Sequence, residues 1–366
     1  MKRLLCLFFA LLLTITLASC NTKKPDDVSL EFTAEYPEDW ESWEEWANNS
    51  WVYPTNQPGT AADAPATLEA GTYKVGVCIY KFDDTFMTNY RNEIESYFAS
   101  LETDDVKFEV TIADGKNDMA EQSIQIDGFI ADKVDVLIIN LVQASSAGDV
   151  TAKAKAAGIP VVYINREPAS DDTQAWDYEG KVAYVGTDSR QAGIVQGEII
   201  ANLPDKGDID GDGVVRYVCL LGDAESIAYA PRTYYALKAL SSVNIKLNCL
   251  LAQRGDWDRA KGQELASNAL SQFGDNIDVI FAENDDMALG AIEACRAAGL
   301  VIGTDLYIVG IDATDPARDA IADGDLTGTV LNDYVGLSRA AVNAATLAIN
   351  GDALMRYYIL DFLAIT

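Results

Sequence analysis

From residue 72 onward, short apolar runs alternate with stretches in which apolar residues recur every three or four positions. The short runs predict buried β-strands, and the longer stretches predict amphipathic helices. The predicted strands are 73–80, 107–113, 134–140, 160–164, 216–221, 244–251, 278–282 and 307–311, and the predicted helices are 89–101, 120–132, 147–157, 233–240, 258–273 and 286–298. Because the two kinds of element alternate, we expect parallel sheets with right-handed crossovers.

The N-terminal residues form a separate unit. Two basic residues precede an apolar run over residues 4–17, which has the length of a signal-peptide core and is short for a membrane span. The run ends in the sequence Leu-Ala-Ser-Cys20, which resembles a bacterial lipobox. We therefore expect residues 1–19 to be a lipoprotein signal peptide and Cys20 to be lipidated, with an ordinary signal peptide as the alternative. This anchor would be the only contact with the membrane.

Residues 20–71 are acidic and rich in Asn, Thr and Pro, and we expect them to form a tether. Within the tether, Trp40, Trp43 and Trp46 are three residues apart, so a short helix would place them on one face. One interpretation is a docking patch for a partner or a wall polymer. We favour the other, a linker whose aromatic rings pack on the body of the protein.

Composition excludes several classes of function. The chain has 366 residues, enough for two domains, and a net charge of −30, so nucleic acid is a poor partner. It has no His, which excludes Ser-His-Asp, Cys-His and zinc-His mechanisms. Besides Cys6 and Cys20, the cysteines form no Cys-x-x-Cys pair, and we expect buried thiols, with one disulfide as the alternative. These four are Cys78, Cys219, Cys249 and Cys295.

Polar and aromatic residues follow the ends of several predicted strands, where parallel α/β sheets bind their ligands. They lie in residues 81–87, 165–168, 184–188, 281–286, 309–312 and 328–333. A single acid or Asn there often caps the following helix. Together they indicate a polar cleft, because carboxylates and amides bind vicinal hydroxyls and aromatic faces cover the C–H patches of a sugar.

Three of these runs carry a family resemblance. Residues 76–86, 184–188 and 328–333 read GVCIYKFDDTF, YVGTD and GTVLND, and they resemble the galactose- and glucose-binding branch of the type I periplasmic binding proteins. The similarity extends over about residues 73–350. It implies an α/β fold of two lobes, each a doubly wound parallel sheet flanked by helices, with the ligand in the cleft between them.

The resemblance also implies lobe boundaries and a function. Residues 72–185 and 333–366 should form the N-terminal lobe, and residues 186–332 the C-terminal lobe. The protein should be a monomer without enzymatic activity that captures a monosaccharide, such as galactose or glucose, outside the cytoplasm. It would present the closed form to the permease of an ABC transporter, and in this family also to a chemoreceptor.

Eight ligand-binding residues follow from the resemblance by position. Asp84 and Asn165 should hold the 4- and 6-side of the sugar ring, and Phe86 and Trp257 should sandwich it. Arg232 should reach the ring oxygen and the anomeric hydroxyl. The residues expected on the 2- and 3-hydroxyls are Asn284, Asp312 and Asn332.

The chain departs from the family pattern in two places. Ser226 and Ala228 stand where the family has a His and an Asp that contact the sugar. A hydrogen bond to a charged group contributes about 1.5–3 kcal/mol, so we expect altered affinity or specificity near the anomeric carbon and the 6-position. Candidates to compensate are Asp223, Glu225 and Tyr229. In the family, the chain also crosses between the lobes a third time near its C-terminus. The residues up to Thr366 do not show whether this chain makes that crossing.

An acidic turn with the sequence DIDGDGV resembles the start of an EF-hand loop, and we expect it to hold a structural Ca²⁺. The twelfth position is Cys219, and the family takes its last carboxylate from a distant strand instead. The expected ligands are the side chains of Asp208, Asp210, Asp212 and Asp278 and the carbonyl of Val214. Arg216 stands where the family has a neutral amide ligand, and a guanidinium cannot bind a cation. A surface acidic turn is the alternative.

Three other functions share features with this sequence. A sugar-active enzyme could use Asp84 and Asp312 as acid and base, but nothing indicates a nucleophile or a catalytic metal. A lac-repressor-like regulator shares this fold, but it needs a basic DNA-binding head in place of the acidic tether. The remaining alternative is a surface lipoprotein that keeps the fold with altered or lost sugar binding.

Overall fold

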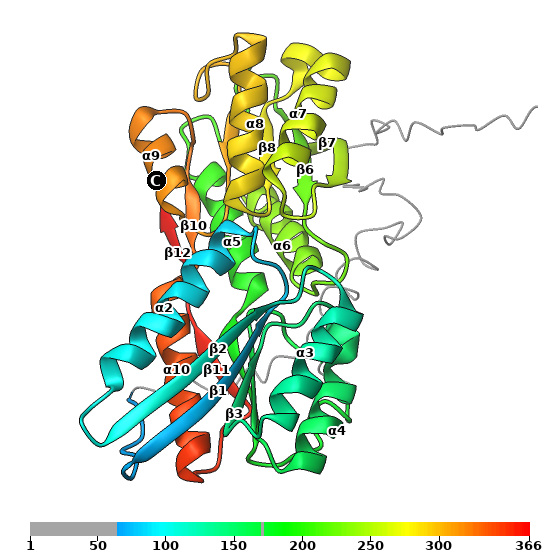
Figure 1. Cartoon of the computed structure of the whole chain (residues 1–366). Coiled ribbons are helices and arrows are strands. Elements are labelled where there is room, and N and C mark those ends of the chain that lie inside the picture. Colours follow the sequence, from blue (N-terminus) through cyan, green and yellow to red (C-terminus); the bar gives the residue numbers. More distant parts are fainter. Residues whose placement is uncertain (1–63, 170–171) are drawn as a thin grey trace, which may run out of the picture.

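The structure, a computed structural model, describes residues 64–169 and 172–366. The predicted signal peptide, the lipidation site Cys20 and the segment with Trp40, Trp43 and Trp46 lie outside these residues. In the described part, a six-stranded sheet and a four-stranded sheet form the centres of two lobes, drawn one below the other in Figure 1. No helix of the described part is long and apolar enough to span a lipid bilayer.

The first lobe contains a six-stranded sheet in the order β11-β5-β4-β3-β1-β2, and every neighbouring pair is parallel. Its strands are β1 (Gly71–Ile79), β2 (Val106–Asp114), β3 (Val136–Ile139), β4 (Val161–Ile164), β5 (Val182–Thr187) and β11 (Tyr357–Leu360). The central strands are uninterrupted apolar runs because helices cover both faces of the sheet.

Four helices cover the first sheet. On one face lie α2 (Thr85–Leu101) and α10 (Tyr334–Asn350), and on the other lie α3 (Met119–Ala131) and α4 (Ala147–Ala157) (Figure 1). Alternate residues of β1 pack on opposite sides: Val75 and Val77 belong to the core under α2 and α10, and Cys78 to the core under α3 and α4. A short 3-10 helix, η1 (Ala144–Ser146), precedes α4.

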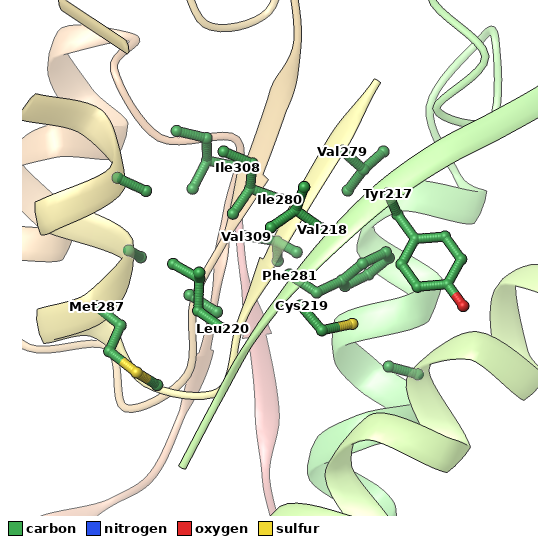
Figure 2. Close-up of a cluster of buried hydrophobic side chains, with 14 of the residues drawn as sticks. Tyr217, Val218, Cys219, Leu220, Val279, Ile280, Phe281, Met287, Ile308 and Val309 are labelled. Atoms are coloured by element: carbon green, nitrogen blue, oxygen red, sulfur yellow. The ribbon is translucent and has the colours of Figure 1, made fainter. Parts of the chain in front are cut away.

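The second lobe contains a parallel sheet in the order β7-β6-β8-β9. Its strands are β6 (Val214–Leu221), β7 (Lys246–Arg254), β8 (Val279–Ala282) and β9 (Tyr307–Val309), and its helices are α5 (Ser189–Ala201), α6 (Tyr229–Ser241), α7 (Arg259–Phe273), α8 (Asp285–Ala298) and α9 (Asp315–Asp323), with the 3-10 helix η2 (Gly274–Asn276). Figure 2 shows its core, where Tyr217 and Phe281 point to one face and Met287 of α8 packs on the other. The four cysteines in the described part are buried, and no disulfide joins them.

The predicted lobe assignment of the C-terminal residues is wrong in part. Residues 333–366 were all expected in the first lobe, but only α10 and β11 lie there. Strand β12 (Leu363–Ile365) pairs antiparallel with β10 (Thr329–Leu331), and Phe362 is buried in the second core. The residues from Phe362 onward therefore lie on the second lobe, and the third crossing between the lobes is present. The apolar run 357–365 looks continuous in sequence, but Asp361 separates two strands in different lobes.

Candidate functional site

The eight predicted ligand-binding residues meet in one cavity between the lobes. The space between its lining residues amounts to about 520 Å³, and this value includes open solvent. Asp84, Phe86 and Asn165 reach it from the first lobe. From the second lobe, Arg232 reaches it from α6, and the other four come from loops after strands. Its lining comprises Tyr80, Asp84, Phe86, Met87, Asn165, Arg166, Thr187, Ser189, Ser226, Ala228, Arg232, Trp257, Asn284, Asp312 and Asn332.

Two of these residues also cap helices. Asp84 precedes α2, and its Oδ1 accepts a hydrogen bond from the Met87 amide at 2.7 Å, while Oδ2 accepts one from the Tyr80 hydroxyl at 2.5 Å. Asn284 precedes α8 in the same way, and its Oδ1 accepts from the Met287 amide at 3.0 Å. The cap fixes each side chain at the cavity wall, so capping and ligand binding are compatible roles.

Asp312 and Asn332 are held together at the second lobe's side of the cavity. The Asp312 amide donates to the Val330 carbonyl at 2.8 Å, and the Asp312 carbonyl accepts from the Asn332 amide at 3.3 Å. Asn332 Nδ2 donates to Asp312 Oδ1 at 3.2 Å. This pairing keeps Asp312 at a φ of 126°, a backbone conformation that is costly for a residue with a side chain. Such strain is typical of functional sites.

Two buried polar atoms of the cavity have no partner within the described part of the protein. They are Nε of Arg232, a donor, and Oδ1 of Asn332, an acceptor. The Arg232 side chain is oriented by its Nη1, which donates to the Glu283 carbonyl at 2.7 Å. An unsatisfied buried polar group costs about 1–3 kcal/mol, so both atoms favour a ligand or water that supplies the missing hydrogen bonds.

Two carboxyl groups of the cavity, those of Asp312 and Asp84, have raised pKa values. Burial raises the pKa of Asp312 well above its ordinary value, although the Arg232 guanidinium opposes this shift. Burial also raises the pKa of Asp84, opposed by its hydrogen bond from Tyr80. Both carboxyl groups therefore gain from hydroxyl donors that replace lost water.

The aromatic residues come from opposite lobes. Phe86 is 6% exposed and packs edge-on against Tyr90, with ring centroids 5.9 Å apart. Trp257 is 9% exposed, and the Arg232 guanidinium carbon lies 5.4 Å from the centroid of its ring. The Trp257 backbone has a φ of 64°, and its carbonyl accepts from Asn284 Nδ2 at 3.2 Å. Apolar faces are thus available on both sides of the cavity.

Arg166 is a cavity residue that the sequence prediction missed. Its Nη1 donates to the Val142 carbonyl at 2.6 Å, and its guanidinium carbon lies 3.9 Å from the Tyr80 ring centroid. Its Nη2 forms an ion pair with Asp223 at 2.8 Å, which joins the first lobe to the second. The only signal in the sequence is its place directly after Asn165, at a strand end. Asp223, one candidate to replace the missing contacts, is thus engaged across the cleft.

Ser226 and Ala228 both line the cavity, at the positions where the family pattern has polar contacts. The Ser226 hydroxyl accepts a long hydrogen bond, 3.4 Å, from the Ala228 amide. Ala228 brings no polar side-chain atom. The chemistry of this part of the cavity therefore differs from that of the galactose- and glucose-binding branch.

The predicted calcium loop does not fit calcium as it stands. The carboxylates of Asp208, Asp210 and Asp212 lie within 4.8 Å of one another, as the sequence pattern predicts. However, the Arg216 guanidinium forms ion pairs with Asp210, Asp212 and Asp278. Two unit charges of like sign 4 Å apart repel by about 4 kcal/mol at an effective dielectric of 20, and calcium carries two. Arg216 thus competes for the oxygens that a bound calcium would need.

Glu283 lies behind the cavity and should make stability depend on pH. Burial raises its pKa from 4.5 to about 7, although the Thr233 hydroxyl and the Gly222 amide donate to it. The folded state therefore keeps a proton that the unfolded state releases, and the free energy of unfolding falls as the pH rises from 4.5 to 7. In Glu283→Gln, the decrease in the free energy of unfolding over this pH range should be smaller by about 1–3 kcal/mol. Urea unfolding at several pH values checks this, and a pH-independent difference from the wild type would contradict it.

Comparisons with known proteins agree with this geometry. Residues 75–353 match the family model described as a periplasmic binding protein domain. A Rhizobium meliloti protein named for rhizopine binding is 34% identical, over 84% of this chain and 94% of its own length. The D-galactose/methyl-galactoside binding periplasmic protein MglB of Haemophilus influenzae is also 34% identical, over 75% of this chain and 80% of its own.

A solved structure extends the comparison to three dimensions. It is an ABC transporter solute binding protein from Bacillus halodurans with bound myo-inositol, 30% identical, with a TM-score of 0.70. The match covers 82% of this chain and 96% of that one. The family match spans most of the chain, and the two-lobed α/β fold is the same. This chain therefore belongs to the periplasmic binding protein family.

Proposed function

We propose that this protein is an extracytoplasmic solute-binding protein that captures a neutral monosaccharide or cyclic polyol between its lobes for an ABC transporter. The observation that carries the proposal is the convergence of eight side chains from both lobes on one cavity. A ligand that touches both lobes stabilises the closed arrangement, which a permease can distinguish from an open one.

The chemistry of the cavity supports a neutral polyhydroxylated ring. Asp84, Asp312 and the amides offer acceptors and donors for hydroxyl groups, and Phe86 and Trp257 offer apolar faces. Arg166 is already paired with Asp223, which leaves Arg232 as the cation nearest to Asp312. Among the described residues that line the cavity, an anionic sugar would meet two carboxyl groups and no unpaired second cation, so it should bind poorly.

The ligands named for the relatives limit the range of candidate ligands for this protein. One relative is named for galactose and methyl-galactoside, one for rhizopine, and one solved structure holds myo-inositol. Galactose or glucose is the ligand that the sequence resemblance favours. Ala228 removes a polar contact expected for those sugars, which extends the proposal to cyclic polyols.

The same relatives are binding proteins, which supports a function without catalysis. Asp84 is engaged by a backbone amide and by Tyr80, and Asp312 by Asn332, so both carboxyl groups serve as fixed hydrogen-bonding groups. We include in the proposal a lipid anchor at Cys20, a monomeric state and a permease partner. The finding that would favour the alternative, a lipoprotein that has lost sugar binding, is the absence of any ligand response.

A thermal-shift panel tests the proposal. We expect galactose, glucose, ribose, allose or myo-inositol to raise the unfolding midpoint, because a ligand that binds only the folded state stabilises it by RT ln(1 + [L]/Kd). A ligand at 100 times its Kd contributes about 2.7 kcal/mol. Glucuronate and galacturonate are the matched anionic controls and should give no shift. A response to the acids alone, or to no compound, would contradict the proposal.

A further inference from the structure

The acidic loop before β6 is folded as a cation-binding loop. Its turns run through Gly211 and Gly213, at φ values of 73° and 89°, and bring backbone amides onto the carboxylates. Asp208 accepts from the Asp212 and Gly213 amides at 3.1 and 2.9 Å, and Asp212 accepts from the Val214 amide at 2.9 Å. The Asp212 amide also donates to Asp210 at 3.1 Å. These bonds hold three carboxylates close together, and because like charges repel, a positive charge nearby stabilises the loop.

Arg216 supplies that charge from within the chain. Its Nη2 pairs with Asp212 Oδ2, and its Nη1 lies 3.5 Å from Asp210 Oδ2 and 3.7 Å from Asp278 Oδ2. The Arg216 amide also donates to Asp278 Oδ2 at 2.7 Å, which ties the start of β6 to the residue before β8. The Asp278 side chain is only 4% exposed and that of Arg216 only 21%, so this contact is largely shielded from water.

We propose that the Arg216 guanidinium is the resident cation of this loop and that the loop keeps its fold without calcium. A guanidinium spreads one charge over several donors, so it can bridge carboxylates from two segments. Calcium would need six to eight oxygen ligands, and several of these oxygens already accept from Arg216 or from the loop amides. The inference is independent of the sugar proposal, because it concerns only the loop.

The test compares Arg216→Gln with the wild type in chelator and in millimolar calcium. The wild type should unfold at the same midpoint in both. Arg216→Gln removes the guanidinium and offers a neutral amide oxygen, so it should unfold earlier than the wild type in chelator. Calcium should raise its midpoint by several degrees. Calorimetric titration with calcium should give saturable binding to Arg216→Gln, at least about tenfold tighter than to the wild type.

A second variant separates a specific site from general charge screening. Arg216→Gln combined with Asp212→Asn removes a carboxylate ligand as well, and its calcium response should be lost. Two results would overturn the proposal: a wild-type midpoint that falls in chelator and recovers with calcium, or an Arg216→Gln variant as stable as the wild type that binds no calcium. Neither result depends on whether a sugar binds in the cleft.

Discussion

Replacing Arg232 with Met is expected to lower the affinity for the bound sugar or polyol by about 10²- to 10³-fold, which corresponds to about 3–4 kcal/mol. Arg232 carries a buried donor, Nε, that has no partner among the described residues, and its charge favours the ionised form of the buried Asp312. The variant loses a charge-assisted hydrogen bond to the ligand and leaves Asp312 without its cation. Truncating one member of a buried charged pair costs about 2–5 kcal/mol.

Calorimetry on the Arg232→Met variant measures this effect, with an unfolding curve to show that the fold is retained. Arg296→Met is a matched control, because the Arg296 side chain is 64% exposed and pairs with Asp325 at the surface. The control should bind as the wild type does. Wild-type affinity in Arg232→Met would mean that the unpartnered donor does not face the ligand.

Gly222→Ala should weaken ligand binding by about 100-fold, because displacing a buried aromatic contact costs about 2–4 kcal/mol of binding free energy. A Cβ at this position would lie 1.8 Å from the Trp257 ring, so the ring must move out of its place. The backbone cannot easily yield instead, because the Gly222 amide donates to the buried Glu283 carboxylate at 2.6 Å. The aromatic face on the second lobe is therefore displaced.

Gly128→Ala provides the matched control. Gly128 lies in α3, where an added Cβ would meet nothing within 4 Å, so this variant should bind normally. The measurement is the dissociation constant of all three proteins for the same ligand. If Gly222→Ala bound as tightly as the wild type, Trp257 would not be a wall of the binding site.

The sequence predicts the fold best where elements are long and apolar. Strands such as β3 and β4 are uninterrupted apolar runs between helices, and the alternation alone predicts them. The region after β9 was not assigned to elements, because α9 buries only Ala317 and β10 and β12 have three residues each. In the Ala-rich α10, small side chains give little contrast between its faces. Only the structure shows that β12 returns to the second lobe.

The family resemblance predicted by position eight of the residues that line the cavity, but it did not predict the electrostatics of the cavity. Capping explains why Asp84 and Asn284 precede helices, but no local pattern indicates that Arg166 pairs with Asp223, 57 positions away. Similarly, the spacing of Asp208, Asp210 and Asp212 indicates a cation loop. The place of the Arg216 side chain among these carboxylates depends on the three-dimensional fold. Ion pairs between segments that are distant in the sequence are therefore the part of the site that could not be predicted.

The central claim is that the two lobes close on one neutral polyhydroxylated ring. Isothermal titration calorimetry of the protein, with the panel compound that gives the largest thermal shift, tests it most directly. We predict saturable binding of one ligand per chain, with a negative heat-capacity change because the aromatic walls bury apolar surface. The absence of measurable binding for every neutral sugar and cyclic polyol, in a protein that is folded, would contradict it.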